Sequence, residues 1–65
     1  MEMKKITFNE IITKGECEKT LKDGLQNTYK MPDGERFIVE ITREGASIEM
    51  YAPNGEYLTG WFERL

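Results

Sequence analysis

Residues 35–52 alternate between apolar and polar side chains in two runs that meet at Glu44-Gly45. Because successive side chains of a strand point to opposite faces, this pattern predicts two antiparallel strands. A two-residue turn at Glu44-Gly45, with glycine supplying a positive φ, would set the register. We then expect one face to collect Phe37, Val39, Ile41, Ile48, Met50 and Ala52. The other face would collect Ile38, Glu40, Thr42, Ser47, Glu49 and Tyr51, with Glu40 directly opposite Glu49.

Two further turns share one signature, at residues 31–35 (Met-Pro-Asp-Gly-Glu) and 52–56 (Ala-Pro-Asn-Gly-Glu). Proline followed by a residue that tolerates the next turn position and then by glycine favours three-residue hairpin loops with a bulge. The first loop predicts a strand from Leu25 to Met31. The second predicts a strand after Glu56. The expected pairs are Tyr29 with Phe37, Leu25 with Ile41, Tyr51 with Tyr57, Met50 with Leu58, Ile48 with Gly60, Ser47 with Trp61 and Ala46 with Phe62.

The N-terminal part is predicted to be helical. Thr7 and Glu10 form a capping-box pattern, and Phe8, Ile11 and Ile12 fall on one helical face, which indicates a helix from about Phe8 to Lys14. Gly15 would end it in a left-handed conformation. For residues 16–24 we favour a second helical segment. The alternatives are a strand with Cys17, Lys19 and Leu21 on one side, or one bent helix reaching Asp23. Residues 4–6 could add an edge strand.

The expected fold is therefore α+β: a short N-terminal helical segment packed on one face of a four-stranded antiparallel β-meander. Residues 1–65 would form a single small domain, with the lead-in and helical segment in 1–24 and the meander in 25–65. The core would contain Leu25, Tyr29, Phe37, Val39, Ile41, Ile48, Met50, Leu58 and Phe62, covered by Phe8, Ile11 and Ile12.

Composition narrows the function classes. A chain of 65 residues buries only about 60% of its unfolded surface, so it gains from a partner, and we expect a homo-oligomer. Cys17 is the only cysteine and histidine is absent, which excludes an internal disulfide and argues against a zinc site. The net charge of −3 argues against direct nucleic-acid or membrane binding. No apolar run approaches the ~20 residues of a membrane span. The lone cysteine fits a reducing cytoplasm.

The candidate site is the second face of the sheet, with Ile38, Glu40, Glu49, Tyr51, Tyr57 and Trp61. A row of aromatic side chains on a solvated sheet is typical of a contact surface, although ordinary cross-strand aromatic pairs would give the same pattern. Glu40 and Glu49 could await a cation or could both point into water.

We therefore expect a non-enzymatic protein without a cofactor. It would bind or inhibit another protein through this face, as a phage- or mobile-element-encoded antagonist of a host defence enzyme would. Two alternatives stay open. One is a homo-oligomer that encloses and sequesters a small molecule, and the other is a structural subunit of a larger assembly.

Overall fold

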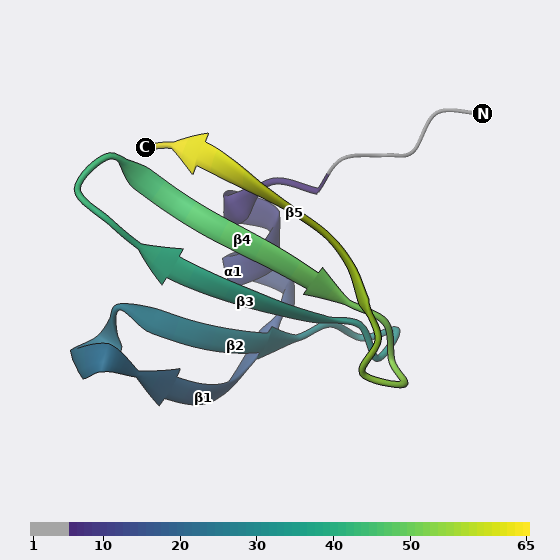
Figure 1. The fold of residues 1–65 in the computed structure, drawn as a ribbon. Helices are drawn as coiled ribbons and strands as arrows, with labels where there is room; N and C mark the ends of the chain where they lie inside the picture. Colours follow the sequence, from purple (N-terminus) through teal and green to yellow (C-terminus); the bar gives the residue numbers. More distant parts are fainter. Residues whose placement is uncertain (1–5) are drawn as a thin grey trace.

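The computed structural model describes residues 6–65, which form an antiparallel sheet with a short helix behind it (Figure 1). In chain order the elements are α1 (Phe8–Lys14), β1 (Glu16–Leu21), the 3-10 turn η1 (Lys22–Gly24), β2 (Gln26–Lys30), β3 (Arg36–Ile41), β4 (Gly45–Tyr51) and β5 (Tyr57–Arg64). The strands lie in sequence order, so β1 and β5 are the two edges. The four predicted strands are present, and β1 precedes them as a fifth.

The predicted helix α1 is confirmed, together with its cap. Thr7 Oγ1 accepts a hydrogen bond from the Glu10 amide at 3.2 Å, and Glu10 Oε1 accepts one from the Thr7 amide at 3.3 Å. The left-handed stop at Gly15 is wrong, because this residue is extended (φ −86°, ψ 156°). Glycine is needed there for space: a Cβ would lie 2.6 Å from the Ile11 carbonyl oxygen and 3.1 Å from Tyr29 Cβ.

Residues 16–24 do not form the second helix that we favoured. They form β1 and the turn η1, and β1 pairs with β2 through Cys17 opposite Tyr29 and Thr20 opposite Asn27. Lys22 and Asp23, both at positive φ, reverse the chain between the two strands. Pairing with β2 thus outweighs the weak local preference for a helix in this segment. Of the edge strand suggested for residues 4–6, residues 4 and 5 lie outside the described residues, and Ile6 belongs to no strand.

The register between β3 and β4 differs from the predicted one by two residues. Val39 pairs with Ile48 instead of Met50, and Arg43-Glu44 forms the tip of the turn instead of Glu44-Gly45. Thr42 closes this turn: its amide donates to the Gly45 carbonyl at 2.8 Å, and its hydroxyl accepts from the Glu44 amide at 3.3 Å. A shift of two keeps every side chain on its predicted face.

The register between β4 and β5 changes by one residue at a bulge. Tyr51 pairs with Tyr57 as predicted, but Met50 pairs with Thr59, so the strand irregularity falls at Leu58. From there on, each β5 side chain lies on the face opposite to the predicted one, because a one-residue shift inverts a strand. Trp61 therefore pairs with Ile48 on the helix side, and Phe62 pairs with Ser47 on the other side.

The core lies between α1 and the sheet. Its buried apolar side chains are Ile11, Met31, Phe37, Val39, Ala46 and Ile48. Each large side chain fully buried in this way contributes roughly 1.5–3 kcal/mol. The predicted pair of Tyr29 with Phe37 is confirmed. Three residues assigned to the core, Leu25, Leu58 and Phe62, are instead exposed.

Candidate functional site

The face of the sheet away from α1, which we call the open face, is covered by no other element among residues 6–65 (Figure 1). The strand pairings place three rows of side chains across it. One row runs Lys30, Arg36, Tyr51 and Tyr57; the next runs Thr28, Ile38, Glu49 and Gly60; the third runs Leu21, Gln26, Glu40, Ser47 and Phe62.

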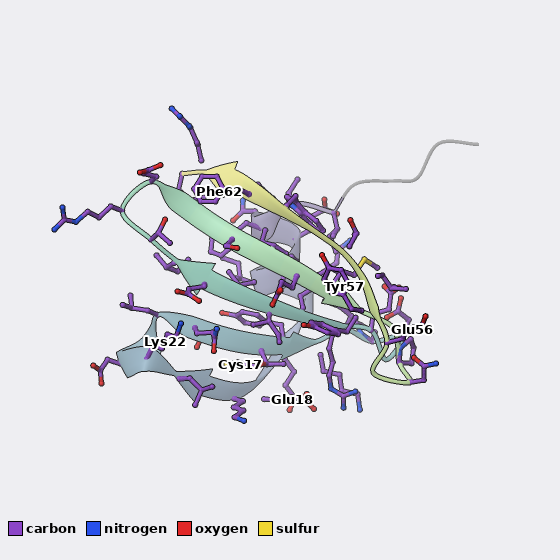
Figure 2. The ribbon with its side chains drawn as sticks, viewed as in Figure 1. Cys17, Glu18, Lys22, Glu56, Tyr57 and Phe62 are labelled. Carbon is purple, nitrogen blue, oxygen red and sulfur yellow. The ribbon has the colours of Figure 1, made fainter. Side chains whose placement is uncertain are left out.

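Five of these side chains are large and apolar or aromatic; Leu21 lies at the β1 edge, and the other four lie nearer β5. We call these four the open-face patch: Ile38, Tyr51, Tyr57 and Phe62. Tyr51 and Tyr57 meet edge to face, with ring centroids 5.6 Å apart and planes at 69°. Tyr57 is 54% exposed and Phe62 47% exposed, and Figure 2 shows them near opposite ends of β5.

Gly60 makes room for Tyr57 on the open face. A Cβ at this position would lie 2.9 Å from the Tyr57 hydroxyl oxygen. The phenol of Tyr57 therefore extends along its own strand, towards the C-terminus, and covers the glycine.

The acidic groups of the open face have partners. Glu40 Oε1 accepts hydrogen bonds from Lys22 Nζ at 3.1 Å and Gln26 Nε2 at 3.2 Å. Glu49 pairs across the ladder with Ile38, and its Oε1 accepts from the Tyr51 hydroxyl at 3.5 Å. The predicted opposition of Glu40 and Glu49 is therefore wrong, because Glu40 faces Ser47. The carboxylates are held singly at separate points and do not form a pair.

Two ionisable groups on this face titrate away from their usual range. The hydrogen bond from Arg36 Nε to Glu18 Oε1, at 2.8 Å, lowers the pKa of that carboxyl. Loss of solvent around the phenol, followed by the charge of Glu49, raises the pKa of Tyr51. Tyr51 thus stays a neutral hydrogen-bond donor over the physiological pH range.

The structure brings five of the six predicted site residues to one face: Ile38, Glu40, Glu49, Tyr51 and Tyr57. It removes Trp61, which packs on Phe37 on the helix side, and it adds Phe62. One signal in the sequence favours this exchange. Without the bulge, Gly60 would face Ile48 and leave a core position empty while Trp61 lay in water. With the bulge, Trp61 occupies the core position opposite Ile48 and Gly60 lies on the open face.

A hollow lies on the helix side of the sheet, next to α1. It is a groove of about 890 Å³ between α1, the turn at residues 31–35 and the inner face of β3–β5. Its apolar lining includes Ile6, Met31, Pro32, Phe37, Met50 and Trp61, and Glu10, Lys14, Asp33 and Glu35 are its charged residues. Glu10 pairs with Lys14 at 3.8 Å, whereas Asp33 and Glu35 lie near each other. Desolvation, and then the charge of Asp33, raises the pKa of Glu35.

Within residues 6–65 there is no group of three or more carboxylate or thiol side chains that could hold a metal ion. Cys17 is exposed, and its Sγ lies 3.6 Å from Thr20 Oγ1 and 3.9 Å from Asn27 Oδ1. Neither neighbour is a cation or a base that would activate the thiol.

Within the same described range, no helix has the length and apolar character needed to cross a membrane. Comparison of the chain with family models, curated proteins and solved structures finds no match.

Proposed function

We propose that this protein acts by contact, as a non-enzymatic binding protein that holds another protein against its open-face patch. The observation that carries this proposal is the Tyr51–Tyr57 pair on a sheet face that no other described element covers. Tyrosine and phenylalanine are enriched where proteins bind each other, because each offers a large rigid surface with little side-chain entropy to lose.

The surroundings of the patch support the same function. Charged side chains lie around it, and the contacts of Glu18, Glu40 and Glu49 are made within the chain. A partner that covers the patch therefore does not strand an unpaired carboxylate in a dry interface, which would be costly. Blocking a surface of an enzyme, as an antagonist of a host defence enzyme does, requires no further chemistry from this chain.

The test compares three variants as baits in cells of the natural host. Tyr51→Ala and Tyr57→Ala remove patch side chains, and Ile12→Ala removes a half-exposed apolar side chain of α1 as a matched control. We expect a partner that Ile12→Ala and the wild type retain and that both tyrosine variants lose, with affinity reduced at least tenfold. A partner held equally by all four proteins would contradict the proposal, provided that circular dichroism shows all four folded.

The groove on the helix side favours a second candidate function, the binding of a small organic cation with an apolar body. The groove has the volume of a small-molecule site, and its aromatic and thioether lining suits an apolar body. Burial, and then the charge of Asp33, raise the pKa of Glu35 in its lining, so a positive charge there would favour the ionised form of Glu35.

Trp61 is the only tryptophan, and it lines the groove, so its fluorescence reports on binding directly. We expect 4-phenylbutylamine to change the emission at lower concentration than the neutral 4-phenylbutan-1-ol does. In the Glu35→Gln variant, the concentrations at which the amine and the alcohol change the emission should lie closer together. Equal responses to the amine and the alcohol would remove the second candidate.

A further inference from the structure

The two edges of the sheet differ in how well they are guarded against pairing with another strand. An edge strand presents unpaired amides and carbonyls, and proteins usually protect it with charges, especially lysine, and with bulges. β1 has both: Glu16, Glu18 and Lys19 lie within its six residues, and its register shifts between Cys17 and Lys19.

β5 lacks this protection over most of its length. Its bulge lies at the start, and six consecutive pairs follow it, from Thr59 with Met50 to Arg64 with Gly45. Residues 59–62 carry no charge. The carboxylate of Glu63 is already engaged on the helix side, where Oε2 accepts from the Phe8 amide at 2.8 Å and from Trp61 Nε1 at 3.3 Å.

Exposed apolar side chains gather on the same strand. Seven large apolar side chains are exposed among the described residues, and four of them lie at or just after β5: Tyr57, Leu58, Phe62 and Leu65. A small domain with six buried apolar residues in its core gains stability from covering such a strand.

We infer that the outer edge of β5 pairs antiparallel with β5 of a second copy of this chain, and that the two sheets join into one. The twofold axis of such a pair runs perpendicular to the sheet and passes near Trp61 or Phe62. In either register, Glu63 lies opposite an uncharged residue of the other copy, Thr59 or Trp61. A parallel arrangement would instead turn the second sheet over, so that the two open faces would lie on opposite sides.

Symmetry also favours a closed dimer over an open array in which each molecule joins the next. Joining β5 of one molecule to β1 of the next would repeat without closing, whereas β5 with β5 closes after two molecules. The charges and bulge of β1 act against the open arrangement. Antiparallel partners share a face, so the two open faces become continuous and their Tyr57 and Phe62 side chains lie on one surface. The pairing uses the backbone of the outer edge of β5, whereas the proposed function uses the side chains of the open-face patch; Tyr57 and Phe62 belong to both, and the pairing does not depend on the proposed function.

The test uses two variants from one row of the open face. Phe62 on β5 and Leu21 on β1 lie at its opposite ends and are almost equally exposed, at 47% and 46%. We expect light scattering after gel filtration to give a dimer for the wild type and for Leu21→Lys. Phe62→Lys should raise the dimer dissociation constant at least tenfold. A wild-type monomer at 0.1 mM, or equal effects of the two lysines, would overturn the inference.

Amide hydrogen exchange locates the contact without any mutation. Between micromolar and submillimolar wild-type protein, we expect exchange in residues 59–64 to slow with concentration while exchange in residues 16–21 stays constant. Slowing in both strands, or protection of β5 that does not depend on concentration, would contradict pairing between copies. The second result would mean that the chain covers this edge itself.

Discussion

Trp61 packs its ring edge against Phe37, with ring centroids 6.3 Å apart and planes at 78°. This contact exists only because the bulge at Leu58 moves Trp61 to the helix side of β5 and Phe62 to the open face. The composition of the core and of the open-face patch both depend on that one extra residue.

Neighbouring residues of β5 should therefore differ sharply in their contribution to stability. Trp61→Ala removes a ring from the core, and we expect it to lower the free energy of unfolding by about 3 kcal/mol. Phe62→Ala removes an exposed ring and should cost less than about 1 kcal/mol. Urea denaturation followed by circular dichroism measures both. The reverse order would indicate the register without the bulge.

Gly45 should tolerate no side chain, because the backbone of the neighbouring strand β5 lies where its Cβ would point. A Cβ at this position would collide with the carbonyl oxygen of Glu63 and lie 2.8 Å from Arg64 Cα, and backbone atoms cannot move aside cheaply. We expect Gly45→Ala to lower the free energy of unfolding by about 3 kcal/mol, as overpacking does. Gly55→Ala is the control, since no atom lies within 4 Å of its added Cβ. It should cost about 1–2 kcal/mol through its positive φ alone. Equal losses in urea would contradict the predicted crowding at Gly45.

Ionisation of Glu35 should make the stability of the fold depend on pH. Its pKa is raised above the ordinary 4.5 in the folded state, so the ionised carboxylate opposes folding at neutral pH. Glu35→Gln should therefore raise the melting temperature at pH 7. The gain should shrink as the pH falls through the raised pKa and vanish below 4.5, where the wild-type carboxyl is protonated in both states. A difference that stays constant between pH 7 and pH 4 would contradict this account.

Glu40 and Glu49 should contribute independently, because the actual register separates them and gives each its own partner. We expect the effects of Glu40→Gln and Glu49→Gln on unfolding to add within about 0.5 kcal/mol. A double-mutant cycle measures this. A larger coupling energy, with the double variant more stable than the two single effects add up to, would indicate that Glu40 and Glu49 lie directly opposite each other, as the strand alternation suggested.

Much of the fold can be predicted from local sequence. The capping box at Thr7 and Glu10, the two proline-glycine turns and the alternation in β3 and β4 each correspond to what the structure contains. These signals are local: a cap, a turn and a period of two are complete within a few residues.

The remaining features depend on contacts between distant segments. β1 is a strand because β2 offers it a pairing edge, and its own residues 16–21 show only the weak alternation of Cys17, Lys19 and Leu21, which left the strand as an alternative to the helix. The turn between β3 and β4 moved because Gly45 is required opposite Arg64 in the ladder and not at the tip. The bulge at Leu58 forms because it places Trp61, and not Gly60, on the core side of β5. The two-residue register shift between β3 and β4 left each side chain on its predicted face. The one-residue shift between β4 and β5 moved the β5 side chains after the bulge to the opposite face.

The most direct test of the binding surface places a photo-crosslinking amino acid, p-benzoylphenylalanine, at position 57 and, separately, at position 12. Position 57 lies in the open-face patch and position 12 on α1, and both side chains are exposed. After irradiation in the natural host, we expect a crosslinked partner protein from position 57 that position 12 does not give. The same partner from both positions, or from position 12 alone, would contradict it.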